Sequence, residues 1–228
     1  MSTRAEGSVG GFDEPALTKA DYAYREMRSA ILDGRLRPGA VVTSEVVAAE
    51  LRLSTTPIRE ATRRLVGEQL VTLSAHRDVR VNPLSSAEIT ELYAVRFLLD
   101  PFAAALAATH TDDAGLTVPR EVLPKKLRRM EPHESVHTNR AFHSAIYRRS
   151  GNDVLTALLD SLWDRTDRYR LILAQPPQIA RQAHDEHIAI AEAFEARDAE
   201  RIRVLTEEHM HSTLSNLLQH LERWQAQA

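Results

Sequence analysis

The stretch "STTPIREATRRL", residues 54–65, indicates a short helix with one apolar face. Ile58, Ala61 and Leu65 recur at spacings of three and four residues, which places their side chains on one side of a helix. Pro57 suits the first turn of such a helix, because the amide groups of that turn need no partner within the helix. The stretch therefore predicts a helix whose apolar side packs on neighbouring elements.

The opposite side of this helix carries two arginines. Arg59 and Arg63 are four residues apart and share the outward face, and Ser54 or Thr56 can cap the first turn. Arginine recognises O6 and N7 of guanine in the major groove of DNA, and serine and threonine hydroxyls contact phosphates. The pattern favours a DNA-reading helix, and the alternative is an ordinary surface helix with solvated arginines.

The segments on either side of this helix complete a recognisable order of elements. The spacing of apolar residues predicts a first helix over residues 18–33, and "VVTSEVVAAELRL" predicts a second, with Thr43 or Ser44 as its N-cap. After the third helix, "LVTLS" and "VRVNP" predict the two strands of a short hairpin. Helix, helix, short turn, helix and hairpin is the order of a winged helix-turn-helix domain, which we expect over residues 17–82.

The composition places this domain in an ordinary globular protein. Hydrophobic residues make up 43% of the 228 residues and charged residues 27%, and the absence of cysteine fits a reducing cytoplasm. We expect no secretory signal and no membrane span, and we expect residues 1–16, which are polar and rich in glycine, to be disordered. The net charge is −3, yet residues 17–81 hold 11 lysines and arginines against 8 acidic residues. The basic excess therefore lies in the segment predicted to bind DNA.

The remainder of the chain, residues 83–228, predicts an all-α bundle. A long helix is expected in "SAEITELYAVRFLLDPFAAALAATH". Its broad apolar stripe consists of Ile89, Leu92, Val95, Leu98 and Leu99. "REVLPKKLRRMEP" is a weaker, proline-interrupted segment. Further helical segments are expected at about 136–150, 152–173, 178–196 and 199–222. About 140 residues suffice for a hydrophobic core of their own.

Histidines are concentrated in this second region. His143, His187 and His209 fall on three different predicted helices, and bundles commonly build metal sites from such positions. Neutral imidazole suits Zn, Ni, Cu or Fe. The alternative is that these are ordinary core or surface histidines. The dipeptide His184-Asp185 also permits a metal-dependent phosphohydrolase, although that chemistry needs further histidine and aspartate partners.

The chain resembles the GntR family of transcription regulators, in the FadR-like subfamily that has a helical FCD domain. In the first region the resemblance rests on "ILDGRLRPG" and "VVAAELRLSTTPIREATRRLVGEQLV", and in the second on "ITELYAVRFLLDPFAAALAA", "NRAFHSAIYRRSGN" and "DEHIAIAEAFEARDAERIRVLTEEHM". The resemblance implies a mostly α fold, with an N-terminal winged helix-turn-helix followed by a C-terminal bundle of six or seven helices. It also implies a homodimer.

Site residues follow from the resemblance where this sequence matches the family's motifs. The DNA-binding positions are Ser54, Thr55, Thr56 and Arg59, with His76 and Arg77 in the wing, and Arg63 is added from helical geometry. The implied metal ligands are Asn139, His143, His187 and His209. An arginine early in the effector domain corresponds to Arg96, which can pair with an effector carboxylate.

Some positions depart from the family's pattern. Arg52 and Gln69 stand where the family usually has glycine, and Asp78 replaces a glycine in the wing. Asn139 stands where the first metal ligand is usually aspartate, and a neutral amide oxygen is the weaker ligand. The segment between Thr109 and Arg140 is short for the family, which predicts that one helix of the bundle is reduced.

These observations predict a cytoplasmic, ligand-responsive regulator, by default a repressor, and not an enzyme. We expect it to bind double-stranded operator DNA, a divalent metal ion such as zinc or nickel, and a small carboxylate or sugar acid. Two alternatives remain at this point: a metal-sensing regulator in which the ion is the signal, and a metal-dependent hydrolase.

Overall fold

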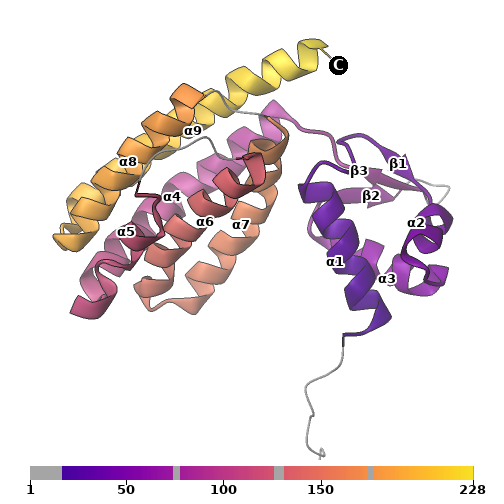
Figure 1. Cartoon of the computed structure of the whole chain (residues 1–228), viewed down its shortest axis with the longest axis horizontal. Coiled ribbons are helices and arrows are strands. Elements are labelled where there is room, and N and C mark those ends of the chain that lie inside the picture. Colours follow the sequence, from indigo (N-terminus) through magenta and orange to yellow (C-terminus); the bar gives the residue numbers. More distant parts are fainter. Residues whose placement is uncertain (1–16, 74–77, 126–130, 174–176, 228) are drawn as a thin grey trace, which may run out of the picture. The chain divides into compact units, whose positions relative to one another are not determined.

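A computed structural model describes residues 17–73, 78–125, 131–173 and 177–227 (Figure 1). The predicted tail over residues 1–16 lies outside this part of the chain. The described chain forms two compact units. One comprises the chain up to Ser29 together with Val41–Arg80, and the other comprises Ala30–Ala40 together with the chain from Val81 onward.

The first unit contains the predicted three helices and a small sheet. The helices are α1 (Lys19–Leu32), α2 (Ser44–Leu51) and α3 (Thr55–Gly67), and the strands are β1 (Val41–Val42), β2 (Val71–Leu73) and β3 (Val79–Val81). The strand order is β1-β3-β2, with β1 antiparallel to β3 and Val42 opposite Val79. The hairpin of β2 and β3 was predicted. The two-residue strand β1 was not, because it is too short to show an alternating pattern.

Two non-glycine residues in this unit have left-handed backbone. Arg52 ends α2 with φ 55° and ψ 42°, and Gln69 has φ 58° after α3. These are two of the positions at which glycine was expected, and left-handed φ explains that expectation because glycine adopts it without a steric penalty. Here the left-handed conformation is adopted by residues that take it less readily than glycine.

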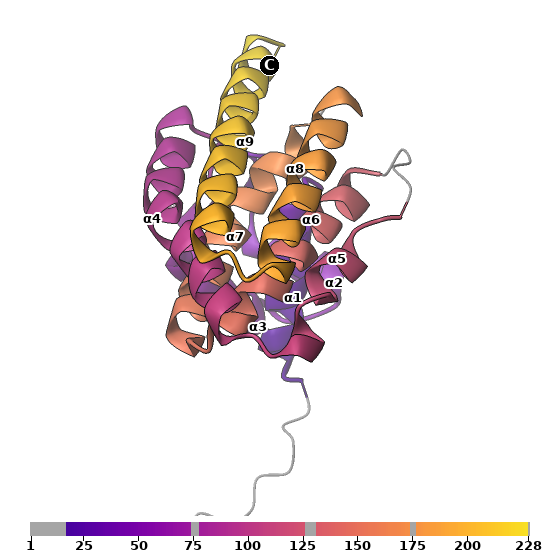
Figure 2. The same cartoon turned by 90° about the vertical axis from the view of Figure 1, so that its left-hand side faces the viewer.

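The second unit is a bundle of six α-helices within the described residues. They are α4 (Ser86–His110), α5 (Val118–Val122), α6 (Pro132–Tyr147), α7 (Asp153–Ile172), α8 (Pro177–Glu195) and α9 (Ala199–Gln227), with short 3-10 turns at Asp113–Gly115 and Arg148–Ser150. Helix α9 runs between α4 and α8 (Figure 2). With only five residues, α5 is the reduced helix that the short segment predicted.

The expected apolar stripe of α4 is correct only in part. Ile89 and Leu92 are buried, whereas Val95 is 46% and Leu98 is 74% exposed. Their place in the core is taken by Tyr93 and by the alanines of the second half of the helix, such as Ala104, which are fully buried. Periodicity placed the apolar residues on a helix correctly, but it did not distinguish the core-facing side from an apolar outer side.

Helix α7 is fastened to the segment that leads into the bundle. The Tyr169 hydroxyl donates to a carboxylate oxygen of Glu88 at 2.6 Å and accepts from the backbone N–H of Ser85 at 3.0 Å. Arg168, which is 2% exposed, pairs with the same Glu88 and donates to the backbone carbonyl of Asn82 at 3.3 Å. Burial and the hydrogen bond to Glu88 raise the pKa of Tyr169 to about 12. The last turn of α7 is thereby tied to residues 82–88.

One described helix, α4, is long and apolar enough to cross a membrane. Its most apolar window has a mean hydropathy of 1.3, and half of that window is buried within the protein. Core helices pass the same test, so length and composition are weak evidence for a membrane span here.

Candidate functional site

Helix α3 presents the residues predicted to bind DNA. Ile58, Ala61 and Leu65 are fully buried, as expected, while Arg59 and Arg63 are exposed. Neither arginine has a hydrogen bond or ion pair with any residue in the described part of the chain. The helix therefore offers two free guanidinium groups on a face backed by a packed core.

The start of α3 is also open to a ligand. Ser54 occupies the N-cap position, yet its side chain makes no capping hydrogen bond. Ser54 and Thr56 are exposed and Thr55 is half-buried. Unused hydroxyls beside the free amide groups of a helix N-terminus suit contact with a phosphate. His76 and Arg77, the predicted wing contacts, lie outside the described residues.

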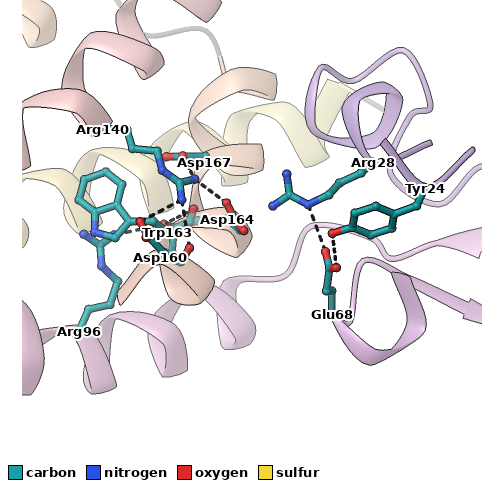
Figure 3. A network of polar contacts seen from close by, with 10 residues as sticks. Tyr24, Arg28, Glu68, Arg96, Arg140, Asp160, Trp163, Asp164 and Asp167 are labelled. Carbon is teal, nitrogen blue, oxygen red and sulfur yellow. Dashed lines mark hydrogen bonds and ion pairs between the residues drawn. The ribbon is translucent and has the colours of Figure 1, made fainter. Parts of the chain in front are cut away.

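A polar cluster fixes α3 against α1. Arg64 donates to the carboxylate of Asp21 at 2.7 Å and lies 3.8 Å from the centre of the Tyr24 ring. Glu68, at the end of α3, accepts hydrogen bonds from the Tyr24 hydroxyl at 2.5 Å and from Arg28 at 3.1 Å (Figure 3). The third arginine of the helix thus has a structural contact, unlike Arg59 and Arg63.

In the bundle, three predicted metal ligands lie together. His143 of α6, His187 of α8 and His209 of α9 are 2%, 6% and 2% exposed, and their ligand nitrogens all lie within 4.8 Å of one another. Nε2 of His187 and Nε2 of His209 are 3.3 Å apart. Three helices distant in sequence therefore direct three imidazoles toward one point.

The environment favours the neutral form of these imidazoles. Burial is the main cause that lowers the pKa of all three. The charges of His187 and His209 lower the pKa of His143 further, and those of His209 and His184 lower the pKa of His187. Arg170 also lowers the pKa of each of the three, since it adds positive charge nearby. Neutral imidazole is the form that binds a metal ion.

Two side chains orient the rings of His209 and His143 through contacts with their Nδ1 atoms. The carboxylate of Glu186 lies 2.6 Å from Nδ1 of His209, and the Tyr147 hydroxyl lies 3.2 Å from Nδ1 of His143. Burial is the largest single influence and raises the pKa of Glu186, but the hydrogen bond with His209, the charge of His209 and hydrogen bonds with Gln182 and Ser212 together leave that pKa below its ordinary value. When Nδ1 is held in this way, Nε2 is the nitrogen left for a metal ion.

Asn139, the fourth predicted ligand, lies one helical turn before His143 on α6. Its Nδ2 is buried and has no hydrogen-bond partner within the described residues, and the same holds for Nε2 of His143. The oxygen and nitrogen of an amide are interchangeable by a half-turn of the group. That half-turn would bring the oxygen, which is the atom that binds metals, to the position of Nδ2.

Arg96 lies in the interior with its donors engaged. It is 1% exposed and donates to Asp100 at 2.7 and 3.3 Å and to the Thr166 hydroxyl at 3.1 Å. Its guanidinium lies 4.1 Å from the centre of the Trp163 ring (Figure 3). Although burial lowers the pKa of Arg96, the charge of Asp100 raises it above its ordinary value. That Arg96 binds an effector stays a prediction. Within the protein, the carboxylate of Asp100 already pairs with its guanidinium.

Sequence reasoning missed the residues that support the site. Asp100 and Tyr147 each follow a predicted site residue by four positions, Arg96 and His143 respectively, so helical spacing could have revealed them. Glu186 meets His209 across two helices, and no local signal predicts that contact. Of the dipeptide considered for a phosphohydrolase, Asp185 is exposed and does not face the cluster of histidines.

Comparisons with known proteins agree with this arrangement. Residues 19–81 match the gntR family of bacterial regulatory proteins, and residues 91–212 match the FCD domain. The HTH-type transcriptional regulator McbR of Escherichia coli (strain K12) is 27% identical over 204 residues, covering 87% of this chain and 92% of that protein. The HTH-type transcriptional repressor GlaR of the same organism is 26% identical, covering 82% and 90%.

A solved structure of E. coli McbR/YncC has a TM-score of 0.73 at 24% identity, covering 90% of this chain and 99% of that chain. At this level of identity the likeness supports the order and packing of the elements. It says nothing about which ligand the bundle holds.

Proposed function

The chain belongs to the GntR family of transcription regulators and carries an FCD domain, and from this premise we propose that it is a ligand-responsive repressor. In this proposal residues 17–82 bind operator DNA, while residues 83–228 dimerise and hold a divalent metal ion and a small acid. The protein acts in the cytoplasm and is a regulator rather than an enzyme.

The face of α3 supports the DNA-binding half of the proposal. Arg59 and Arg63 are exposed and unpaired within the described chain, and Ser54 and Thr56 present hydroxyls at the same end of the helix. Such a helix can enter a major groove with its arginines against base edges and its first turn against the phosphates. His76 and Arg77 would add contacts from the wing.

The residues of the bundle fit a divalent metal ion. Three buried, neutral imidazoles with converging nitrogens, and an amide oxygen from Asn139, form the type of donor set that zinc and nickel accept. The unpartnered Nε2 of His143 supports this reading, because a buried polar atom normally has a partner. When bound, the ion supplies a positive centre that attracts the oxygens of an acid.

An acidic effector suits the charges around this site. Arg170 acts electrostatically on all three histidines, and Arg96 acts on His143 and His209. With a metal ion in place the interior would carry further positive charge, which favours a carboxylate or sugar acid. The effector would relieve repression if it binds one arrangement of the protein more tightly than the other.

A homodimer is supported by an exposed apolar face on the bundle. Val95, Leu98 and Phe102 follow one line along α4 and are 46%, 74% and 53% exposed, and Val154 and Leu158 of α7 are 73% and 53% exposed. Helices α4 and α7 pack against each other. Exposed apolar side chains grouped in this way are typical of an interface. A two-fold dimer would place two copies of α3 on a near-palindromic operator.

One observation also favours a second function, in which the metal is itself the signal. Asn139 provides a neutral ligand where the family usually has a charged one, and a weaker site can respond to the supply of an ion. In that case zinc or nickel alone would change operator affinity.

The converging histidines carry the proposal, and operator binding tests it. The full chain would be titrated onto a DNA fragment from its own promoter, after chelation, after addition of zinc, and after addition of zinc with small acids. We expect binding without acid and release with one of the acids. Release by zinc alone would identify a metal sensor. Turnover of a phosphoester substrate would contradict the assignment as a regulator.

A further inference from the structure

Helices α6 and α7 face each other with polar atoms that the protein does not pair. Within the described residues, seven buried side-chain atoms on these two helices lack a hydrogen-bond partner. Five of them are Asn139 Nδ2 and His143 Nε2 of α6, and Trp163 Nε1, Asp167 Oδ1 and Arg170 Nε of α7. We call this group of five the α6–α7 polar face. A buried polar atom normally has a hydrogen-bond partner, so the group suggests a ligand.

Contacts around Trp163 connect this face to the proposed metal and effector site. The centres of the Trp163 and His143 rings are 5.1 Å apart. The guanidinium carbon of Arg170 lies 5.5 Å from the centre of the Trp163 ring. Asp167 follows Trp163 by four residues and precedes Arg170 by three, so the three side chains leave α7 on the same side. The acceptor of the face is thus beside the groups proposed to hold an acid.

Asp167 has one oxygen engaged and one free. Arg140 donates to Oδ2 of Asp167 at 3.1 Å, and the same guanidinium group also serves Asp164 at 2.5 Å and Asp160 at 3.4 Å (Figure 3). Oδ1 is left without a partner in the described chain, in a residue that is 5% exposed. Burial raises the pKa of Asp167 above its ordinary value, and the charges of Arg170, Arg140 and Arg96 partly oppose that rise.

The unpaired atoms include both hydrogen-bond donors and an acceptor, so they need different partners. The indole of Trp163 and the guanidinium of Arg170 are donors, and an acid's oxygens can accept from them, whereas Asn139 and His143 are assigned to the metal ion. A carboxylate oxygen such as Asp167 Oδ1 only accepts, and it repels a second carboxylate. A plain carboxylic acid would therefore satisfy the donors and leave Asp167 unpaired.

We propose that Asp167 accepts a hydrogen bond from a hydroxyl or ammonium group of the effector, so that the bundle selects hydroxy acids or amino acids over unsubstituted acids. This inference rests on the proposed function, since it concerns the acid expected beside the metal ion. It assigns Asp167 to specificity, with Trp163 and Arg170 contacting the acid group.

The test compares acids that share a carbon skeleton and differ only in their hydroxyl groups. Isothermal titration of the zinc-loaded full chain would use lactate and propionate, malate and succinate, citrate and tricarballylate, and gluconate and hexanoate. We expect the hydroxylated member of at least one pair to bind more tightly by about tenfold or more. Alanine and propionate extend the comparison to an ammonium group.

The Asp167→Asn variant then tests the residue itself. Arg140 would hold the amide oxygen, so an NH₂ group would replace Oδ1 and the preference for the hydroxylated acid should fall to about twofold or less. Asp164→Asn is the matched control, because it removes a charge from the same arginine at a side chain that is 30% exposed, and it should keep the preference. Thermal unfolding of both variants verifies that they fold.

The outcomes distinguish a failure of the proposed acidic effector from a failure of the role of Asp167. If acids bind and the unsubstituted members bind equally well, the role of Asp167 is wrong while the acid-responsive function stands. If Asp167→Asn folds and keeps the full preference, Asp167 is again excluded. If no acid of either kind binds to the zinc-loaded protein, the proposed acidic effector is wrong, and the role of Asp167 with it.

Discussion

The guanidinium of Arg96 forms a two-point ion pair with the carboxylate of Asp100, one turn further along α4. The two contacts are 2.7 and 3.3 Å long, and both side chains are almost completely buried. The Tyr147 hydroxyl donates to the same carboxylate at 3.0 Å. A residue expected to meet an effector is thus also part of the packed interior, so its substitution affects stability as well as binding.

Arg96→Met should lower the free energy of unfolding by about 3–5 kcal/mol, because it leaves the charge of Asp100 buried without compensation. Adding Asp100→Asn to that variant removes the buried charge and should restore about 2 kcal/mol. Urea unfolding at pH 7.5 measures both. Equal stability of the single and double variants would show that compensation of Asp100 is not what Arg96 contributes.

Arg59→Ala should weaken operator binding by about 1–3 kcal/mol, because it removes a guanidinium that is free to contact a base. Fluorescence anisotropy at a fixed salt concentration measures the loss. Arg25→Ala is the control: Arg25 is an exposed arginine of α1, and its removal changes the net charge equally. Unchanged affinity in Arg59→Ala would exclude this face of α3 as the reading surface.

His143→Ala should abolish most of the zinc that the purified protein retains, while the helical content stays close to that of the parent. The variant removes one of three converging nitrogens. His137→Ala on the same helix is the matched control, since His137 is exposed. Elemental analysis and circular dichroism supply the two readouts. The ligand set would be refuted by equal zinc in both variants.

Leu98→Glu should convert a dimer to a monomer at micromolar concentration, because it places a charge on the exposed apolar line of α4. Sedimentation velocity distinguishes the two states. Val46→Glu is the control, since Val46 is 50% exposed on α2 and is not part of that line. A parent protein that is monomeric, or a Leu98→Glu dimer, would remove the proposed interface.

Arg52→Gly should raise the free energy of unfolding by about 1 kcal/mol, because glycine adopts the left-handed backbone of this position without steric cost. Arg52→Ala removes the same side chain without relieving the backbone and should not stabilise the protein. Thermal unfolding of the three proteins measures the difference. If Arg52→Ala and Arg52→Gly change the free energy of unfolding equally, the left-handed backbone of Arg52 does not account for the change.

What the sequence predicted well depends on local pattern. The buried side of α3 was predicted because Ile58 and Leu65 repeat at helical spacing, and the order of elements around it is a property of short segments. The strand of Val41–Val42 was missed because its pairing with β3 involves residues about forty positions away. Local signals do not contain such a partner.

The candidate site divides in the same way. The convergence of three histidines was proposed from their places on separate helices, and the geometry of the bundle brings them together. The free oxygen of Asp167 could not be predicted, since it depends on how Arg140 is shared among three carboxylates. The expectation that Leu98 lies in the core was wrong, because hydrophobicity alone does not reveal whether a side chain faces the core or the surface.

Helix α7 contacts both the proposed effector site and the segment that leads into the bundle. In the middle of α7, Trp163 and Thr166 contact Arg96, which is proposed to act on the acid. In the last turn, Arg168 and Tyr169 form hydrogen bonds with residues 82–88, where the chain enters the bundle. A helix is stiff along its axis, so a displacement of α7 near Trp163 would also act on the contacts of Tyr169 with Glu88. In the proposed regulator, α7 would therefore connect the acid site with the start of the bundle.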